Sequence, residues 1–344
     1  MSEPRKHHLV AQVYQRNFAK QKSRSFQVLV LDKTTAKGGL RNVQNTFAER
    51  DWNTVEDAAG TKEFGVEKLL ADHVDALAAP ALQAMRDGRF PLDSADREAM
   101  AVFMAAQLNR GRAIRQNLSE FVAQVNHLML SQAAISYTDE QWLDAIGKVP
   151  SQEQREQIAD SERHFKLRPS NAMLLETLLS SVDEIAELLH MRTWTLARFA
   201  SGCLFTGEHP VVEINPSGES TGSGVMTAER IYMPVSATLA LVLSHPWTNW
   251  PEAVVNGTKD LAVRLNWAML SHPSNTELLL DPNVQGHPLP SLSLLAAGEW
   301  WPWGKDLESE LPVFLHYLSH RPAPSKAGPR HDTYGQSLLS VRGA

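Results

Sequence analysis

The sequence predicts an α+β fold, with a large helical middle and a small, mostly antiparallel sheet built from N-terminal and C-terminal segments. Two observations predict it. Across residues 62–190, apolar residues recur mainly at helical spacing. On either side of this region, short runs of branched and aromatic residues end in glycine, proline or polar turns, which is typical of strands.

The N-terminal third contains both kinds of element. Residues 7–18 fit either a helix or a short strand and turn, and the pattern does not decide between them. Residues 26–32 are rich in branched apolar side chains and precede a polar turn, so they predict a strand. A helical pattern follows over 62–82. Ser94 can cap the next helix, which we expect to continue towards Leu118.

The rest of the helical middle and the C-terminal strands follow in order. Further helices are expected at 121–134, 139–146 and 171–190. Strands are expected at 194–205, 211–214, 231–234 and 238–243, and a last helix at 259–270. Between the second and third of these strands, residues 216–224 form a loop rich in Gly, Ser and Thr.

We expect residues 1–275 to form a single α+β domain. Residues 276–320 are rich in Trp and Pro and centre on the sequence WWPW at 300–303. Proline opposes a regular helix there, and large aromatic side chains are more often buried than exposed. This segment is therefore predicted to be an extension that packs on the domain, and residues 321–344 to be a disordered tail.

Composition excludes several classes of protein. The formal net charge of −6 argues against a surface that is basic overall, although a local basic patch remains compatible with it. Cys203 is the single cysteine, so no intramolecular disulfide can form, as expected in a reducing compartment. The sequence has no apolar run of about 18 residues and no apolar segment behind its N-terminal charges. We therefore expect a cytoplasmic protein with no membrane partner.

Several common catalytic motifs are missing from the sequence. It has no Gly-rich phosphate loop, dinucleotide fingerprint, HExxH, paired CxxC or GxSxG element. Most nucleotide-dependent, zinc-peptidase and serine-hydrolase interpretations therefore lose support.

The N-terminal segment is unusually dense in polar side chains. His8, Gln12, Tyr14 and Arg16 share one face if this segment is extended, and a helix would also keep His8, Gln12 and Arg16 together. A face of this kind suits a phosphate or carboxylate. The adjacent His7 points elsewhere, so we prefer His8 as an acid, a base or a metal ligand. The alternative is that the two histidines only pin the N-terminus.

Two later segments carry further candidates. Gln107 and Arg110 lie one helical turn apart, and Arg112 and Arg115 follow, so this helix can present guanidinium groups to an anion. Its alternative is a solvated face with ion pairs. Glu208 comes at the end of an expected strand and suits proton transfer or metal binding, although acidic residues before a proline often only close a corner.

Six separated elements together resemble the uncharacterised family known as domain of unknown function 4238, whose members occur in bacteria and fungi. They are KHHLVAQVYQRNF at 6–18, FAERDW at 47–52, QLNR at 107–110, TGEHPV at 206–211, MPVS at 233–236 and LN at 265–266. The chain departs from the family pattern at Ala11, at Glu208 and His209 in place of Asp-Asn, and at His73 in an acidic position. The resemblance implies a site without implying a reaction.

Two functions are therefore kept open. The first is a hydrolase of a phosphate-containing substrate, such as a nuclease. His8, His7 and Glu208 would be its catalytic residues, and Gln12, Tyr14, Arg16, Gln107 and Arg110 would bind substrate. A divalent metal is compatible with this set. The second is a non-catalytic module that binds an anionic small molecule, a nucleic acid or a partner in a bacterial defence or stress system.

Overall fold

The protein was analysed in a computed structural model that describes residues 5–284, except for 36, 57–60, 165, 215–223 and 249. One of its sheets is built only from strands that follow the helical middle, in the order β10-β11-β12-β8-β13. These strands are β8 (Thr193–Arg198), β10 (Val212–Ile214), β11 (Arg230–Ser236), β12 (Leu239–Ser244) and β13 (Val254–Asn256). Neighbouring strands are antiparallel, except that β13 runs parallel to β8.

A second sheet joins the two ends of the described chain. Its order is β2-β3-β14-β9, and β4 also pairs with β3, outside this order. The strands are β2 (Lys20–Lys22), β3 (Ser25–Asp32), β4 (Gly38–Asn42), β9 (Thr206–Gly207) and β14 (Glu277–Leu280). Leu279 of β14 lies opposite Val30 of β3 and Thr206 of β9, so three distant segments meet at this strand.

Two short antiparallel pairs complete the strands of the described residues. β1 (Lys6–His8) pairs with β5 (Ala48–Arg50), and β6 (Val55–Glu56) pairs with β7 (Lys62–Glu63). Between β1 and β2 the chain forms the helical turns α1 (Gln12–Gln15) and η1 (Arg16–Phe18).

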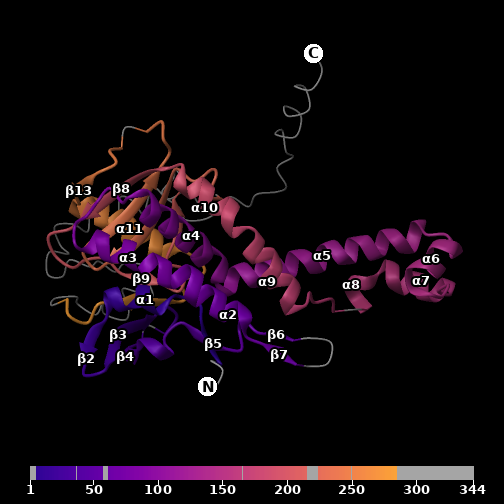
Figure 1. The fold of residues 1–344 in the computed structure, drawn as a ribbon. Coiled ribbons are helices and arrows are strands. Elements are labelled where there is room, and N and C mark those ends of the chain that lie inside the picture. The colour runs from indigo at the N-terminus through magenta and orange to yellow at the C-terminus, as the bar shows by residue number, and fades with distance from the viewer. Residues whose placement is uncertain are drawn as a thin grey trace, which may run out of the picture. The chain divides into compact units, whose positions relative to one another are not determined.

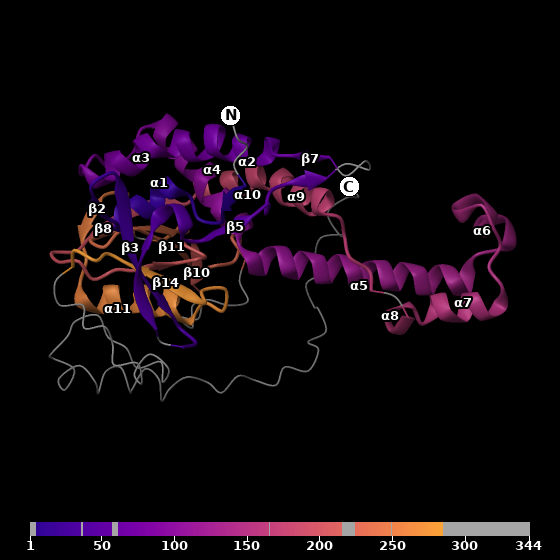
Figure 2. The same cartoon turned by 90° about the horizontal axis from the view of Figure 1, so that it is seen from below.

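Helices cover the first sheet on both sides. Figure 2 shows α3 (Ala76–Arg86) and α4 (Ser94–Arg110) on one side of the strands and α11 (Lys259–Ser271) on the other. Both faces of β12 are therefore covered, and all six of its residues are buried. α4 also packs closely along α10 (Val182–His190). The main core includes Met100, Phe103, Met104, Trp194, Leu196, Ile231, Met233 and Leu241.

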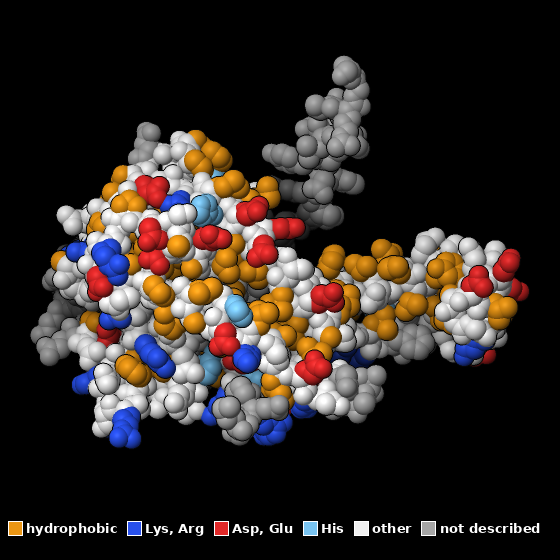
Figure 3. All heavy atoms as spheres, in the orientation of Figure 1, with side chains coloured by type: hydrophobic (Ala, Val, Ile, Leu, Met, Phe, Trp, Pro, Cys, Tyr) orange, Lys and Arg blue, Asp and Glu red, His pale blue; other side chains and the backbone are white. Residues whose placement is uncertain are grey.

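A long helix, α5 (Arg112–Ser136), leads away from the end of α4 and carries short helices along its far half (Figure 1). These are α6 (Asp139–Ile146), α7 (Gln152–Ala159) and α8 (Ser161–His164), and α9 (Asn171–Ser180) returns the chain to α10. α5 keeps several large apolar side chains exposed, as Figure 3 shows along this part of the chain; they include Phe121, Leu128, Met129 and Ile135.

The α+β class is confirmed, with corrections in detail. The strands form two larger sheets and two small pairs, whereas we expected one small sheet. The helix expected to run to Leu118 ends at Arg110, because the backbone at Gly111 is extended. Ser181 separates α9 from α10 without extended backbone, since its φ and ψ are −86° and −6°, and the expected strand at 194–205 ends at Arg198. Residues 7–18 combine part of a strand, a helical turn and a 3-10 turn.

The expected domain boundary at 275 falls just before β14, which is an inner strand of the second sheet. Residues 285–320 of the expected extension and the expected tail at 321–344 lie outside the described residues. Among the helices that the structure does describe, each is too short or too polar to cross a bilayer.

Candidate functional site

The histidine strand is held by its pairing with β5. His7 lies opposite Glu49, and His8 lies opposite Ala48. β5 is bracketed by Phe47 and Asp51, two non-glycine residues with positive φ of 49° and 57°. Non-glycine residues with positive φ are uncommon, and they cluster at functional sites, where the surrounding structure stabilises the strained backbone.

His7 is fully buried and makes a structural contact. Its Nδ1 atom accepts a 2.7 Å hydrogen bond from the Asn53 backbone N–H, and Phe64 meets its ring edge-on. Arg115 stacks on Trp52 and donates to Asn53 Oδ1, which fixes the same turn. The structure therefore places His7 among groups that tie β1 to the turn after β5.

His8 points to the other side of the strand and is half-buried. Its backbone N–H donates to Glu67 Oε1 at 3.3 Å, and its Nδ1 atom lies 3.5 Å from the Gln12 side-chain amide nitrogen. Its Nε2 atom is buried and has no hydrogen-bond partner of good geometry among the described residues. The Gln44 backbone carbonyl also acts on this ring as a hydrogen-bond acceptor, so a substrate would have to displace that contact to reach the ring nitrogen.

An ion pair lies beside His8. Arg110, at the end of α4, donates from NH1 to Asp75 Oδ2 at 3.2 Å, and its NH2 lies 2.8 Å from Oδ1. Asp75 ends a π-helical turn, η3 (Ala71–Asp75), in which the Ala76 N–H bonds to the Ala71 carbonyl five residues earlier. Turns of this kind are rare and frequent at functional sites. His73, which we expected at the acidic position of this helix, is exposed, and the acidic side chain that reaches Arg110 is Asp75.

The electrostatics of this group favour a neutral His8. Burial lowers the pKa of His8 below its usual 6.5, and the nearby Arg110 acts in the same direction. Glu67, the Gln44 backbone carbonyl and Asp75 oppose the shift without reversing it. Burial also raises the pKa of Asp75, against the effect of Arg110. A neutral imidazole near a guanidinium can accept a proton at pH 7.

Gln107 adds a polar group on the same helix as Arg110. It is buried, and neither its amide nitrogen nor its amide oxygen has a hydrogen-bond partner within the described part of the chain. The Nε atom of Arg110 is likewise buried and has no hydrogen-bond partner among the described residues. Since buried polar atoms are usually paired, such a group needs an explanation, and a bound ligand is one.

Two of the expected binding residues lie elsewhere. Tyr14 is fully buried, with its hydroxyl 2.7 Å from the Pro234 carbonyl oxygen and 2.8 Å from the Thr206 hydroxyl. Arg16 is exposed, and its guanidinium lies over the Phe26 ring. Helical turns in place of a continuous strand break the shared face that alternation predicts.

Glu208 is buried, and both oxygens of its carboxylate already accept hydrogen bonds from protein groups. Oε1 accepts from the Thr276 hydroxyl and, at 3.1 Å, from the Glu277 N–H, while Oε2 accepts from Arg112. Arg112 also pairs with Glu49. This second arginine follows Arg110 by two residues, so the α4–α5 junction presents one guanidinium to Asp75 and another to Glu208.

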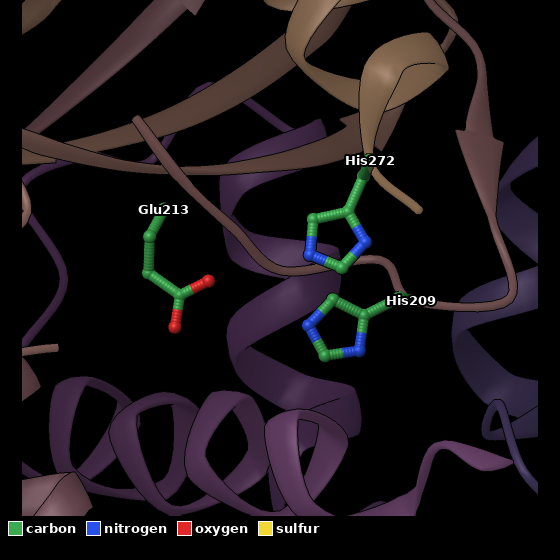
Figure 4. Close-up of side chains that lie close together, drawn as sticks. All are labelled: His209, Glu213 and His272. Carbon is green, nitrogen blue, oxygen red and sulfur yellow. The ribbon is translucent and has the colours of Figure 1, made fainter. Parts of the chain in front are cut away.

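A third group follows directly after Glu208. His209, Glu213 on β10 and His272 at the end of α11 each offer one ligand atom, and these atoms all lie within 4.8 Å of one another (Figure 4). Asn275 fixes His209 by accepting its backbone N–H at 2.6 Å. Gly207 permits this, because a Cβ there would lie 2.3 Å from the Asn275 side chain. These residues could hold a metal ion.

The structure thus places His8, Gln12 and Arg110 near one another, together with Glu67 and Asp75. The last two were not selected from the sequence, because an acidic residue in a helix is ordinarily a solvated one. Glu213 and His272 were also missed. The only signals for them are an acidic residue inside a short apolar strand and a histidine just before a proline.

Comparison with known proteins gives a family and no activity. The model of a family described as "Protein of unknown function (DUF4238)" matches residues 6–278. No curated protein and no solved structure matched the chain.

Proposed function

The chain belongs to the DUF4238 family of proteins of unknown function, and within it we propose a hydrolase of phosphate esters, with nucleic acid as the first substrate class to test. The observation that carries this proposal is the setting of His8. A half-buried imidazole has a lowered pKa and an Nε2 atom that makes no hydrogen bond of good geometry among the described residues, and it lies beside a guanidinium that a carboxylate holds in place.

In this proposal His8 takes a proton from the attacking water through Nε2. The ring proton must then be on Nδ1, and the Gln12 amide can accept it when its oxygen faces the ring. Proton transfer by a positioned side chain contributes about 10²–10⁴-fold to the rate. Arg110, oriented by Asp75, supplies positive charge to the phosphate oxygens.

The other residues expected at the site have different roles in this proposal. Glu208 orients Arg112, because both of its oxygens already accept hydrogen bonds. Tyr14 and His7 support the fold around the site. Arg16 is given no role at the site, because its guanidinium lies over the Phe26 ring.

The test is hydrolysis by the purified chain of bis(p-nitrophenyl) phosphate and of fluorophore–quencher RNA and DNA oligonucleotides. Each is assayed with EDTA and with added Mg²⁺, Mn²⁺ or Zn²⁺. We expect His8→Ala to lower kcat about 10²–10⁴-fold. The control is His190→Ala, which removes a histidine at the end of α10 and should leave the rate unchanged.

The pH profile adds a readout that a structural role would not give. Because burial lowers the pKa of His8, the acidic limb of kcat/KM should have its midpoint below 6.5 and should disappear in His8→Ala. The proposal fails if no substrate is turned over in any of these conditions, or if His8→Ala retains the wild-type rate and profile.

One observation favours the second candidate, a binding module without turnover. Both amide atoms of Gln107 are buried and unpartnered among the described residues, as suits a ligand that offers one donor and one acceptor. Isothermal titration with a panel of nucleotides separates the two functions. Binding that Gln107→Leu weakens tenfold or more, without any product, would support the module.

A further inference from the structure

Three side chains from separate elements converge beyond the His8 group. His209 follows β9, Glu213 lies in β10, and His272 is the C-cap residue directly after α11, so their ligand atoms approach within 4.8 Å only in the folded chain. His209 and His272 are buried, and Glu213 is half-buried. Three titratable groups have thus been brought together away from bulk water.

The two imidazole rings are aligned with each other. They stack with ring centroids 4.5 Å apart and an interplanar angle of 10°. Figure 4 shows a nitrogen of each ring on the same side of the stack, with the Glu213 carboxylate beyond that side and turned toward both. Two nitrogen donors and one oxygen donor therefore face a common space.

Protein partners within the described residues do not account for this arrangement. No hydrogen bond there joins the Glu213 carboxylate to either ring. The Nδ1 atom of His209 is also buried without a partner in this part of the chain, but it lies on the side of the ring away from Glu213, toward Gly111 (Figure 4). The three side chains lie largely away from bulk water, so little solvent is available to stabilise a charge on the carboxylate. A cation between them would stabilise the carboxylate and the neutral rings together.

We propose that His209, Glu213 and His272 bind one divalent transition-metal ion. Two imidazoles and a carboxylate suit zinc and its first-row neighbours, whereas Mg²⁺ and Ca²⁺ prefer ligand sets made of oxygen alone. Three protein ligands leave at least one coordination position open, as in zinc sites where water or substrate completes the shell. The proposal does not depend on the hydrolytic activity, because the His8 group contributes no ligand.

Binding requires two local adjustments. Ligands about 2.0–2.2 Å from a zinc ion lie roughly 3–3.5 Å apart, so the cluster contracts, and the parallel rings turn toward the ion. The Ser274 N–H lies 3.2 Å from His272 Nδ1. Ligation through Nε2 places the ring proton on Nδ1, so this contact is lost when the metal binds.

Two nearby cationic side chains repel a bound metal ion and so weaken its binding. Lys33 donates to the carbonyl oxygen of His272 and acts on the ring electrostatically, and Arg192 acts on Glu213. Glu208, which interacts with Lys33, offsets part of this charge. Lys33→Met should therefore tighten metal binding, which is the opposite of what removal of a ligand does.

The experiment uses the full chain after EDTA treatment and dialysis. Zn²⁺ is added, and bound metal is measured by mass spectrometry and by competition with a chromophoric chelator. We expect one Zn²⁺ per chain. His209→Asn, Glu213→Gln and His272→Asn should each weaken binding at least about 100-fold, more than loss of an outer-shell partner usually costs. His245→Asn, which removes a histidine stacked on Trp247, is the matched control and should bind like the wild type.

A second measurement needs no variant. X-ray absorption of the Zn²⁺-loaded wild-type chain should show the outer-shell scattering of two imidazoles. Thermal unfolding in EDTA checks that each variant folds like the metal-free wild type. The proposal is overturned if the chain retains no Zn²⁺, if the three ligand variants all bind like His245→Asn, or if the absorption spectrum shows no imidazole.

Discussion

At the scale of single residues, the two adjacent histidines show how a strand separates neighbouring side chains. β1 sends His7 to the Asn53 backbone and leaves His8 facing Gln12 and the Glu67–Asp75 side. Successive residues of a strand point to opposite faces, so one ring can support the fold while its neighbour stays available for chemistry. This division explains why His8 and His7 should respond differently to substitution.

Tyr14 provides a test of a residue that was expected to bind substrate. Tyr14→Phe should lower the free energy of unfolding by about 1–3 kcal/mol, because it leaves a buried carbonyl or hydroxyl group without its partner. Urea denaturation measures the change. KM for any substrate found should stay the same.

The matched control is Tyr137→Phe, whose ring is partly exposed at the end of α5 and whose loss of the hydroxyl should have little effect. If Tyr14→Phe instead keeps full stability and raises KM, then Tyr14 contacts the substrate, as the sequence pattern predicts.

Part of the candidate site could be predicted from the sequence. Parity selects His8 over His7, and helical spacing groups Gln107 with Arg110. The acidic residues Glu67 and Asp75 could not be selected, because nothing local shows that Glu67 will meet the His8 backbone 59 positions earlier or that Asp75 will pair with an arginine 35 positions later. Arg16 was included on an assumed continuous element that the chain does not form.

At the scale of elements, helix ends decide which side chains reach the site. α4 stops at Arg110 because Gly111 is extended, and α5 then starts in a new direction. The His209 ring packs against this junction, since a Cβ at Gly111 would lie 3.4 Å from its Nδ1 atom. One short break therefore lies between the Asp75–Arg110 pair and the group that contains His209.

The start of α4 offers a direct comparison of two neighbouring residues. The sequence favours Ser94 as the cap, but the Asp93 side chain accepts the Asp96 N–H at 2.8 Å. Asp93→Ala should therefore lower the free energy of unfolding by about 0.5–2 kcal/mol, as loss of a helix cap does. Ser94→Ala should be close to neutral. Chemical denaturation of both variants checks this, and the reverse order would contradict the observed cap.

At the scale of the whole described chain, the fold depends on pairing between distant segments. β14 lies between β3 and β9, and Tyr14 bonds to groups in β9 and β11. Closing such contacts costs chain entropy before they stabilise anything, so the ends of the domain are expected to order late in folding.

Leu279 and Leu40 test this dependence within one sheet. Leu279 is fully buried in the inner strand β14, whereas Leu40 is 59% exposed on β4. Leu279→Ala should cost about 2–5 kcal/mol. Leu40→Ala should cost much less. A single cooperative transition in both variants, with a lower midpoint only for Leu279→Ala, is the expected result; equal midpoints would show that β14 is not integral to the core.

The sequence predicts most individual elements and fewer of their partners. The strand at 26–32 and the helix at 139–146 carry clear local periodicity, and the structure has them as β3 and α6. The existence of two larger sheets was not predicted, because local pattern does not encode that Leu279 pairs with Val30 almost 250 positions earlier.

The wide turn η3 determines how this site tolerates a change in chain length. Glu67 precedes the turn and Asp75 is its last residue. A π-helical turn takes up one more residue than an α-helical turn, so a single-codon deletion at 71–74 would restore regular winding and leave the flanking segments close to their present directions. Relatives that keep the opening motif but lack this extra residue are therefore expected to retain the surroundings of His8.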